Sequence, residues 1–253
     1  MSAAPAPFPD QWYEISSPDH FWFQWRLAAF RSLLRDFGDL PERPLRVLDV
    51  GCGQGILRRQ LEACSAWVVD GVDTCDHAVA ANPALRGRAF AYDVFEKRAE
   101  MLGRYDAVLL FDVLEHIADD RAFLETAVAH VRPGGFVFLN IPALEVFRGR
   151  YDRAVGHLRR YSKATLQPVV EGAGCRVERL RYWGMGLLPL LAMRNCLTAF
   201  ASDTAAIVAR GFQPPGRLAG ALLDRVGALE RKILPSPPLG ASLLAAARRN
   251  EVG

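Results

Sequence analysis

The sequence predicts a doubly wound α/β fold, in which helices cover both faces of a mainly parallel sheet. Short apolar runs alternate with amphipathic stretches from residue 46 onwards, which is the pattern of repeated strand–helix–strand units. A glycine-rich turn at 51–55 separates the first run from the first helical stretch, and acidic residues follow the next two runs. The chain has 253 residues, of which 51% are hydrophobic, so it can bury the core of one large domain.

The strands follow from the apolar runs. The fifth run is expected to begin after a turn formed by Pro133, Gly134 and Gly135. The expected strands are 46–50, 67–72, 89–92, 106–111, 135–141 and 176–183, with a further β-compatible run at 241–249.

The helices follow from apolar residues at three- and four-residue spacing. An aromatic N-terminal helix is expected to begin at 17–19, where Ser and Asp can cap it, and to stop at Gly38. A later helix is expected to open at Ser162 or Thr165 and to end at 172–174. The remaining expected helices are 56–63, 119–130, 186–203 and 217–233.

The composition argues against several classes of protein. The 31 lysines and arginines stand against 28 acidic residues, and a net charge of +3 is too weak a bias for a nucleic-acid partner. Five cysteines without zinc-type spacing indicate reduced thiols in a cytoplasmic protein. The apolar stretch 183–200 holds Pro189 and Arg194 and is shorter than the roughly 20 apolar residues that cross a bilayer. We expect no transmembrane span, and peripheral contact with a membrane stays open.

The strongest local signal is the glycine-rich turn in VLDVGCGQG (47–55). Glycines allow positive φ and let a ligand approach the backbone, and the helix start behind the turn favours an anionic group. Asp73 follows the second strand, where an acid accepts hydrogen bonds from ribose hydroxyls, and Asp93 follows the third, within reach of an adenine amino group. A glycine-rich loop alone also occurs as an ordinary tight turn between a strand and a helix. The glycine turn, Asp73 and Asp93 together, at three successive strand ends, are far more specific for a nucleotide-type ligand.

These motifs, together with FDVLEHI (111–117) and RPGGFVFLNIP (132–142), resemble in their order those of class I S-adenosylmethionine-dependent methyltransferases. The resemblance is to the group of ubiquinone-biosynthesis-like O-methyltransferases and covers roughly residues 45–183. It implies a seven-stranded Rossmann-like sheet with an antiparallel last strand, and S-adenosylmethionine as cofactor. The cofactor residues that it implies are Asp49, Gly51, Cys52, Gly53 and Gly55 around the methionyl end, Asp73 at the ribose, Asp93 and Val94 at the adenine, and Phe111 near the sulfonium.

The chain departs from that family in one respect. The family usually joins strands six and seven by a short hairpin, whereas here the segment 184–240 intervenes. Since long insertions at such places are often functional, we expect a helical cap over the substrate side. The expected division is an N-terminal helical lid (1–44), a cofactor-binding core (45–183), the cap (184–240) and the final strand (241–253).

Two histidines are candidate catalytic bases. Methyl transfer requires alignment of the acceptor, exclusion of water and, for some acceptors, removal of a proton. His116 follows the fourth strand, and His157 lies in GHLRRY (156–161), which resembles a GHxRRY-type segment of many methyltransferases of this group. The alternatives are structural: His116 would pin the loop after the fourth strand, and His157 would make a loop hydrogen bond. Arg26 lies on the N-terminal helix, which is either a lid or a packing element.

Arg159, Arg160 and Tyr161 are candidate substrate contacts, because guanidinium groups bind carboxylates and phosphates well. A solvated basic turn is the alternative. No metal is expected. Asp112 and Asn140 follow strands four and five as ligands do in catechol-type enzymes, but the second acid beside Asn140 is absent.

The first functional hypothesis is methyl transfer from S-adenosylmethionine to an O or N atom of a small acceptor. The aromatic N-terminus and the apolar insertion favour a hydrophobic one, such as a quinone, a lipid-linked or a polyketide-like molecule. The second hypothesis is a noncatalytic cofactor-binding module that docks on a membrane or a protein through 184–240, where 217–233 forms an amphipathic basic helix. A third hypothesis is a nicotinamide oxidoreductase. It is disfavoured because the dinucleotide-binding motif is G-x-G-x-x-G, and Ile56 stands where that motif has its third glycine.

Overall fold

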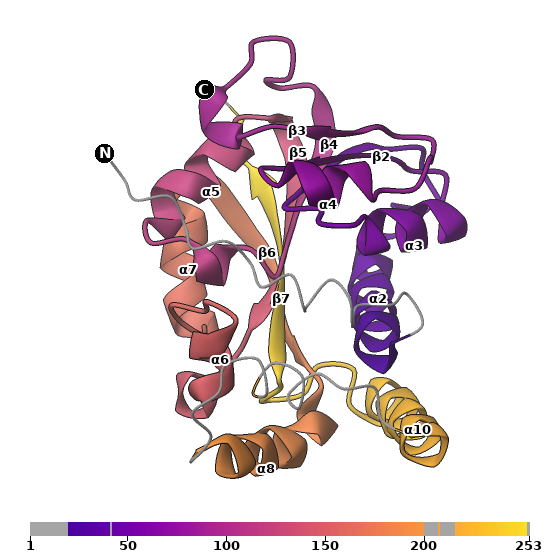
Figure 1. Cartoon of the computed structure of the whole chain (residues 1–253). Helices are drawn as coiled ribbons and strands as arrows, with labels where there is room; N and C mark the ends of the chain where they lie inside the picture. Colours follow the sequence, from indigo (N-terminus) through magenta and orange to yellow (C-terminus); the bar gives the residue numbers. More distant parts are fainter. Residues whose placement is uncertain (1–19, 41, 200–206, 208–215, 252–253) are drawn as a thin grey trace.

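The structure, a computed structural model that describes residues 20–40, 42–199, 207 and 216–251, confirms the α/β prediction. Seven strands form one sheet in the order β3-β2-β1-β4-β5-β7-β6 (Figure 1). Neighbouring strands are parallel from β3 to β5, and β7 runs antiparallel to both β5 and β6. The strands are β1 (Arg46–Val50), β2 (Val68–Asp73), β3 (Ala89–Ala91), β4 (Tyr105–Phe111), β5 (Val131–Pro142), β6 (Cys175–Trp183) and β7 (Ser242–Arg249).

Helices cover both faces of the sheet, as Figure 1 shows for α2 and α3 on one side and α5 and α7 on the other. The described α-helices are α2 (Phe21–Leu34), α3 (Ile56–Cys64), α4 (Asp76–Ala80), α5 (Asp120–Val128), α6 (Arg150–Ala154), α7 (Lys163–Gly172), α8 (Leu188–Thr198) and α10 (Arg217–Ile233). Within the described residues no helix is both long enough and apolar enough to cross a bilayer.

Each face of the sheet has its own hydrophobic core, because successive side chains of a strand point to opposite faces. In β4, Val108 and Leu110 pack with α5 and α7, whereas Leu109 and Phe111 pack with α2 and α3. Burial of both faces explains why β4 is a continuous apolar run rather than an alternating one.

Some predicted boundaries were wrong. The turn expected at 133–135 lies within β5, which begins at Val131 and shifts register opposite Tyr105 and Ala107. A side chain at Gly135 would place its Cβ 2.8 Å from the carbonyl oxygen of Asp106, so glycine is needed for this irregular pairing. The helix start expected at 17–19 was also wrong: α2 begins at Phe21 with His20 as its N-cap, and residues 17–19 themselves lie outside the described residues. The short helices α4 and α6 were not predicted, since five residues are too few to show a helical period.

Other predicted boundaries are confirmed. Gly38, at φ +66°, follows the short 3₁₀ turn that ends the first helical stretch. Ser162 caps α7, accepting a hydrogen bond from the amide of Thr165, whose hydroxyl in turn accepts one from the amide of Ser162. These two positions are the alternative starts that the sequence indicated.

The segment between β6 and β7 leaves and re-enters the sheet at the carboxyl edge of the parallel strands. Ser242, the first residue of β7, pairs with both Pro142 at the end of β5 and Trp183 at the end of β6. From this edge α8 packs on α6, and α10 packs on α2 (Figure 1). A Cβ at Gly227 of α10 would lie 2.7 Å from the ring of Trp25, so glycine allows the close approach of α10 to α2.

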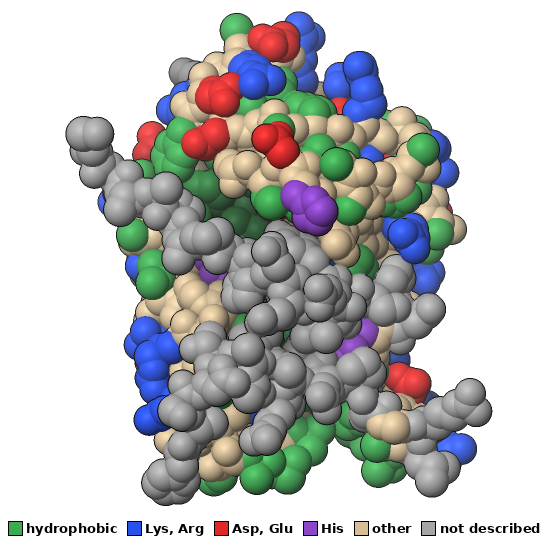
Figure 2. Space-filling view, viewed as in Figure 1, with side chains coloured by type: hydrophobic (Ala, Val, Ile, Leu, Met, Phe, Trp, Pro, Cys, Tyr) green, Lys and Arg blue, Asp and Glu red, His purple; other side chains and the backbone are tan. Residues whose placement is uncertain are grey.

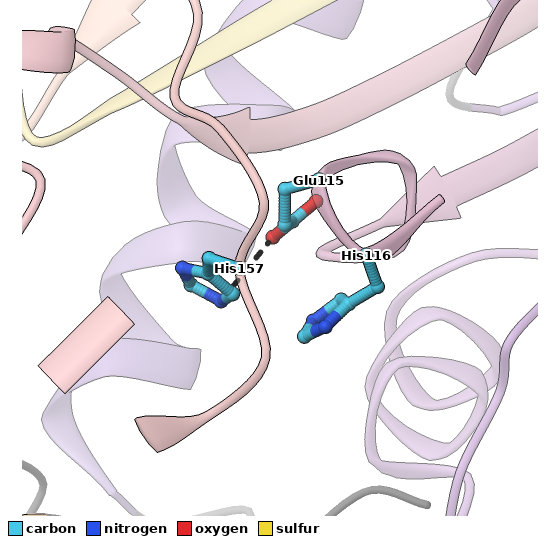
Figure 3. Close-up of side chains that lie close together, drawn as sticks. All are labelled: Glu115, His116 and His157. Carbon is cyan, nitrogen blue, oxygen red and sulfur yellow. Dashed lines mark ion pairs between the residues drawn. The ribbon is translucent and has the colours of Figure 1, made fainter. Parts of the chain in front are cut away.

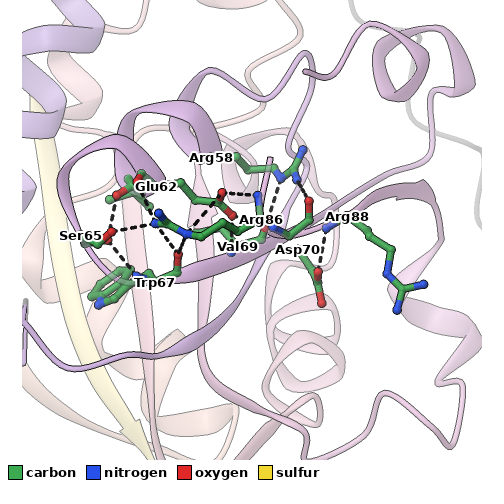
Figure 4. Close-up of polar contacts among 10 residues, drawn as sticks. Arg58, Glu62, Ser65, Trp67, Val69, Asp70, Arg86 and Arg88 are labelled. Carbon is green, nitrogen blue, oxygen red and sulfur yellow. Dashed lines mark hydrogen bonds and ion pairs between the residues drawn. The ribbon is translucent and has the colours of Figure 1, made fainter. Parts of the chain in front are cut away.

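A buried polar network fixes α3 to β2 and to the loop before β3 (Figure 4). The carboxylate of Glu62 accepts hydrogen bonds from the amides of Val69 (2.8 Å), Arg86 (2.6 Å) and Gly87 (2.8 Å). The guanidinium of Arg58 donates to the carbonyl oxygens of Val69 and Gly87, both at 2.9 Å. Because a buried polar group without a partner is costly, this network stabilises the region only as a complete set.

We predict that Glu62→Ala lowers the free energy of unfolding by about 3 kcal/mol, because three amides lose their acceptor. Glu62→Gln keeps one carbonyl oxygen and should lose less. Urea denaturation measures both, with Glu125→Ala, at an exposed position of α5, as the control. Equal urea midpoints for Glu62→Ala and Glu125→Ala would contradict this role.

Candidate active site

The glycine-rich turn follows β1 and has a backbone that only glycine adopts readily. Gly51, Gly53 and Gly55 have φ of +73°, +49° and +76°. The amides of Gly51 and Cys52 both donate to the carbonyl oxygen of Val72, at 2.8 and 3.0 Å, so the turn is fastened to the end of β2. The turn is therefore held at the carboxyl end of β2, and a Cβ at Gly51 would lie 2.6 Å from the side chain of Val113, so glycine is needed for this close packing.

Asn82 is a further residue of this turn, and the sequence did not indicate it. Its Nδ2 donates to the carbonyl oxygen of Gly53 at 2.6 Å, and its Oδ1 accepts from Arg58 Nη1 at 2.7 Å. A Cβ at Gly55 would lie 2.1 Å from Asn82 Oδ1. Asn82 therefore holds the turn from beneath, and the signal that would reveal it is tertiary contact rather than local spacing.

Both carboxylate oxygens of Asp73, at the end of β2, accept hydrogen bonds from backbone amides. Oδ2 accepts from Gly53 at 2.9 Å and Oδ1 from Cys75 at 2.9 Å. A carboxylate has about four lone-pair sites, so each oxygen can still accept a ligand hydroxyl. Asp93 is exposed after β3 and accepts from the amide of Phe95 at 3.0 Å, and the adjacent Val94 is buried.

Asp49, in β1, and Cys52, within the turn, are both buried. Burial raises the pKa of the Asp49 carboxyl to about 7, although the guanidinium of Arg26 opposes the shift. Burial also raises the pKa of the Cys52 thiol, and the carboxylates of Asp49 and Asp73 add to this shift. The sulfur is therefore a thiol at neutral pH, not a thiolate.

A chain of hydrogen bonds crosses the carboxyl ends of β4, β5 and β6. Arg26 Nη1 of α2 donates to Asp112 Oδ2 at 2.6 Å, and Asn140 Nδ2 donates to Asp112 Oδ1 at 2.7 Å. Trp183 Nε1 donates to Asn140 Oδ1 at 2.9 Å. Asp112 and Asn140, which correspond to metal-ligand positions of catechol-type enzymes, thus have protein partners.

Arg26 brings the N-terminal helix onto the site. Its guanidinium carbon lies 5.5 Å from the centre of the Phe111 ring and 5.0 Å from that of Phe23. Its Nε is buried, and no described residue accepts a hydrogen bond from it. Nearby, Trp22 packs on Trp183 with ring centroids 4.8 Å apart. An arginine with an unpartnered buried donor is suited to an anionic ligand group.

The second part of the site joins Glu115 and His116, in the turn after β4, to His157, in the loop after α6, and the three side chains point toward one another in Figure 3. His157 Nε2 lies 3.8 Å from Glu115 Oε1, and the two imidazole rings have centroids 4.8 Å apart. Burial raises the pKa of Glu115 well above its usual range, and the Asp112 carboxylate adds to this shift. Burial lowers the pKa of His116 to about 3, so its ring is neutral at physiological pH.

Asp152 orients His157. Its Oδ1 lies 2.9 Å from His157 Nδ1 and accepts from Arg160 Nε at 2.8 Å, and its Oδ2 accepts from the amide of Gly149 at 2.8 Å. Burial alone would raise the pKa of Asp152, but the hydrogen bond with His157 and the charge of Arg160 hold the pKa well below its usual value. Asp152 is therefore ionised. The sequence did not indicate it, because α6, on which it lies, was not predicted.

The three candidate substrate residues make contacts within the protein. Arg159 Nη1 and the hydroxyl of Tyr161 both donate to Asp120 Oδ2, at 2.7 and 2.8 Å. Arg160 is buried and pairs with Asp152. These contacts give all three a role in holding the loop of His157, and their contact with an acceptor stays a prediction.

Comparison with known proteins identifies the family. Residues 22–180 match the family model described as a methyltransferase domain. The chain belongs to this methyltransferase family. It is 37% identical over 168 residues to a ubiquinone biosynthesis O-methyltransferase of Methylobacterium nodulans, covering 58% of this chain and 68% of that protein. A second protein of the same name, from Rhizobium etli, is 38% identical over 107 residues, and the chain spans only 42% of its length.

Solved structures show the same fold. An S-adenosylmethionine-dependent methyltransferase from Mesorhizobium loti superposes with a TM-score of 0.55 at 16% identity, covering 89% of this chain and 100% of that one. Phosphoethanolamine N-methyltransferase 2 of Haemonchus contortus, solved with S-adenosylmethionine, gives 0.56 at 17% identity, covering 88% and 52%.

The cofactor of this methyltransferase is S-adenosylmethionine, and the residues present fit it. The glycine turn at the end of β1 has the positive φ values of a ligand-binding turn, Asp73 retains acceptor capacity for ribose hydroxyls, and Arg26 has a buried donor without a partner among the described residues. The individual contacts with the cofactor remain predictions.

We predict that affinity for S-adenosylhomocysteine rises with pH up to about 7 and then levels off. The α-ammonium of the ligand favours the ionised Asp49 carboxylate, and one pH unit below the pKa only about a tenth of this group is ionised. Calorimetry across pH measures the slope. Asp49→Asn should bind weakly without that slope, and an unchanged pH dependence in this variant would show that another group titrates.

We also predict that a chelator changes neither cofactor binding nor methyl transfer. The candidate metal ligands among the described residues are Glu115, His116 and His157, whose ligand atoms lie within 4.8 Å of one another. A bound metal would therefore be expected at this cluster. The measurement is metal content and turnover before and after EDTA. Stoichiometric metal that is lost in His116→Ala, together with lost activity, would contradict the prediction.

Proposed function

We propose that the protein transfers the methyl group of S-adenosylmethionine to an oxygen atom, or less favourably a nitrogen atom, of a small hydrophobic acceptor. The observation that carries this proposal is the pairing of His157 with the ionised Asp152 beside the loop after β4. A histidine oriented by a carboxylate is the arrangement that removes a proton from a hydroxyl nucleophile.

The protonation states follow from the hydrogen bonds. The ionised Asp152 accepts a hydrogen bond from Nδ1–H of His157, and in the neutral imidazole this tautomer puts the lone pair on Nε2. At 3.8 Å, Glu115 Oε1 is too far from Nε2 for a hydrogen bond, so Nε2 remains available. Nε2 then takes the proton of the acceptor hydroxyl as the oxygen attacks. The cofactor supplies the electrophilic methyl group.

The surroundings support a hydrophobic acceptor and a covered site. Trp22 and Trp183 lie at the carboxyl edge of the sheet, α10 packs on α2, and α8 packs on α6. We propose that α2 belongs to a lid and α8 and α10 to a cap, so that the acceptor is enclosed and water excluded. The relatives named for ubiquinone biosynthesis support an aromatic or quinone-type acceptor. Turnover only with strictly polar acceptors would exclude this class.

A specific observation also supports docking on a membrane surface through 184–240. Leu222, Leu229 and Ile233 form an exposed apolar stripe on α10, flanked by the exposed Arg225 and Lys232. Hydrophobic side chains also gather at the lower edge of Figure 2, where α8 lies in Figure 1. This pattern is typical of helices that bind anionic lipid surfaces.

Co-sedimentation tests this second candidate. Wild type should bind vesicles that contain phosphatidylglycerol more tightly than vesicles of phosphatidylcholine alone, and Arg225→Glu/Lys232→Glu should lose this preference. Arg59→Glu, at an exposed position of α3, is the control. Methyl transfer by the same preparation excludes a purely noncatalytic role.

We predict that His157→Gln lowers kcat with a phenolic acceptor by about 10²-fold or more, with little change in KM, because the proton acceptor is lost. Asp152→Asn should lower kcat in the same direction. Raising the pH toward the pKa of the acceptor should reduce the defect, since the acceptor then ionises without a base. His77→Gln, on the exposed side of α4, is the control. A defect that does not change with pH would assign His157 a structural role only.

A further inference from the structure

Arg194 is the one charged residue of α8 (LPLLAMRNCLT), and it points inward rather than to solvent. Its guanidinium carbon lies 4.0 Å from the centre of the Tyr151 ring on α6. The next residue, Asn195, donates from Nδ2 to the carbonyl oxygen of Phe147 at 2.8 Å, which fixes α8 to the loop before α6. The position of Arg194 is therefore set by a ring contact and a neighbouring hydrogen bond.

Two of the three guanidinium nitrogens of Arg194 lack hydrogen-bond partners among the residues that the structure describes. Nε and Nη2 are both buried, and neither donates to any residue that the structure describes. These two nitrogens lie on one edge of the guanidinium, and that edge binds the two oxygens of a carboxylate side by side. Stacking on Tyr151 uses the flat face of the group and leaves this edge available.

The charge of Arg194 is also poorly compensated. Asp152 is near enough to act on it, but the oxygens of Asp152 are already bound to His157, Arg160 and Gly149. Burial lowers the pKa of Arg194, and the charge of Arg160 adds to this shift. A buried cation without an acceptor is destabilising, and an anionic ligand would relieve that cost.

We propose that Arg194 binds a carboxylate group of the methyl acceptor. This inference rests on the proposed function and deepens it: the acceptor is a hydrophobic acid whose carboxylate binds at the cap while its hydroxyl faces His157. The carboxylate site at Arg194 and the base His157 are linked through neighbouring residues of α6. Arg194 lies over the ring of Tyr151, and the next residue, Asp152, is the partner of His157. Arg159 and Arg160, for which the sequence predicted such a role, have protein partners instead.

The test compares benzoate with benzamide, which has the same shape but no charge, in the presence of saturating S-adenosylhomocysteine. Wild type should bind benzoate about tenfold more tightly than benzamide, as measured by NMR titration. Arg194→Met keeps an apolar contact with Tyr151 and should lose this preference. Arg194→Lys keeps the charge without the two-nitrogen edge and should retain only part of it. Arg153→Met, at an exposed position of α6, is the matched control and should behave as wild type.

Three outcomes would overturn the proposal. One is equal affinity for benzoate and benzamide in wild type, and another is an undiminished preference in Arg194→Met. The third is weaker binding of S-adenosylhomocysteine in Arg194→Met, which would assign the arginine to the carboxylate of the cofactor. Urea denaturation adds a separate readout: Arg194→Met should be as stable as wild type or more so, because it removes an uncompensated buried charge. Binding is read without turnover, so failure of the proposed methyl transfer is distinguishable from failure of this site.

Discussion

The antiparallel strand β7 is the constraint on which the placement of α8 and α10 depends. It lies between β5 and β6, so its first residue, Ser242, is beside the last residues of both. Any chain inserted between β6 and β7 must therefore begin and end at the carboxyl edge of the parallel strands. That edge also carries the glycine turn and Asp73, because the carboxyl ends of parallel strands meet there. Topology alone thus brings α8 and α10 to the side of the cofactor residues.

The hydrogen-bonded chain from Arg26 to Trp183 makes this edge a single unit. It joins α2, β4, β5 and β6 through Asp112 and Asn140. Asp112 has φ of +59°, a conformation that costs a non-glycine residue of order 1–3 kcal/mol and persists where surrounding contacts hold it. Here both of its carboxylate oxygens are bound. The N-terminal helix is therefore part of the site rather than an appendage.

The two halves of the site are built by different physical means. The part around the glycine turn relies on backbone conformation, because three glycines adopt positive φ there and pack closely on their neighbours. The part around His157 relies on ionic groups: Asp152 pairs with Arg160 and His157, and Asp120 holds Arg159 and Tyr161. Such buried pairs depend on exact packing, and removal of one partner leaves the other charge buried without compensation.

The sequence by itself determined the parallel core, the glycine turn, the acids at the ends of β2 and β3 and the two histidines, because these depend on local periodicity, backbone freedom and motif order. The tertiary structure alone decided which side chains contact these motif residues. Asn82 beneath the turn, Glu115 beside His157, Asp152 behind it and the inward direction of Arg194 all arise from contacts between elements far apart in the chain. No local pattern encodes them, since α4 and α6 are too short to show a period and the burial of a polar side chain depends on what packs against it.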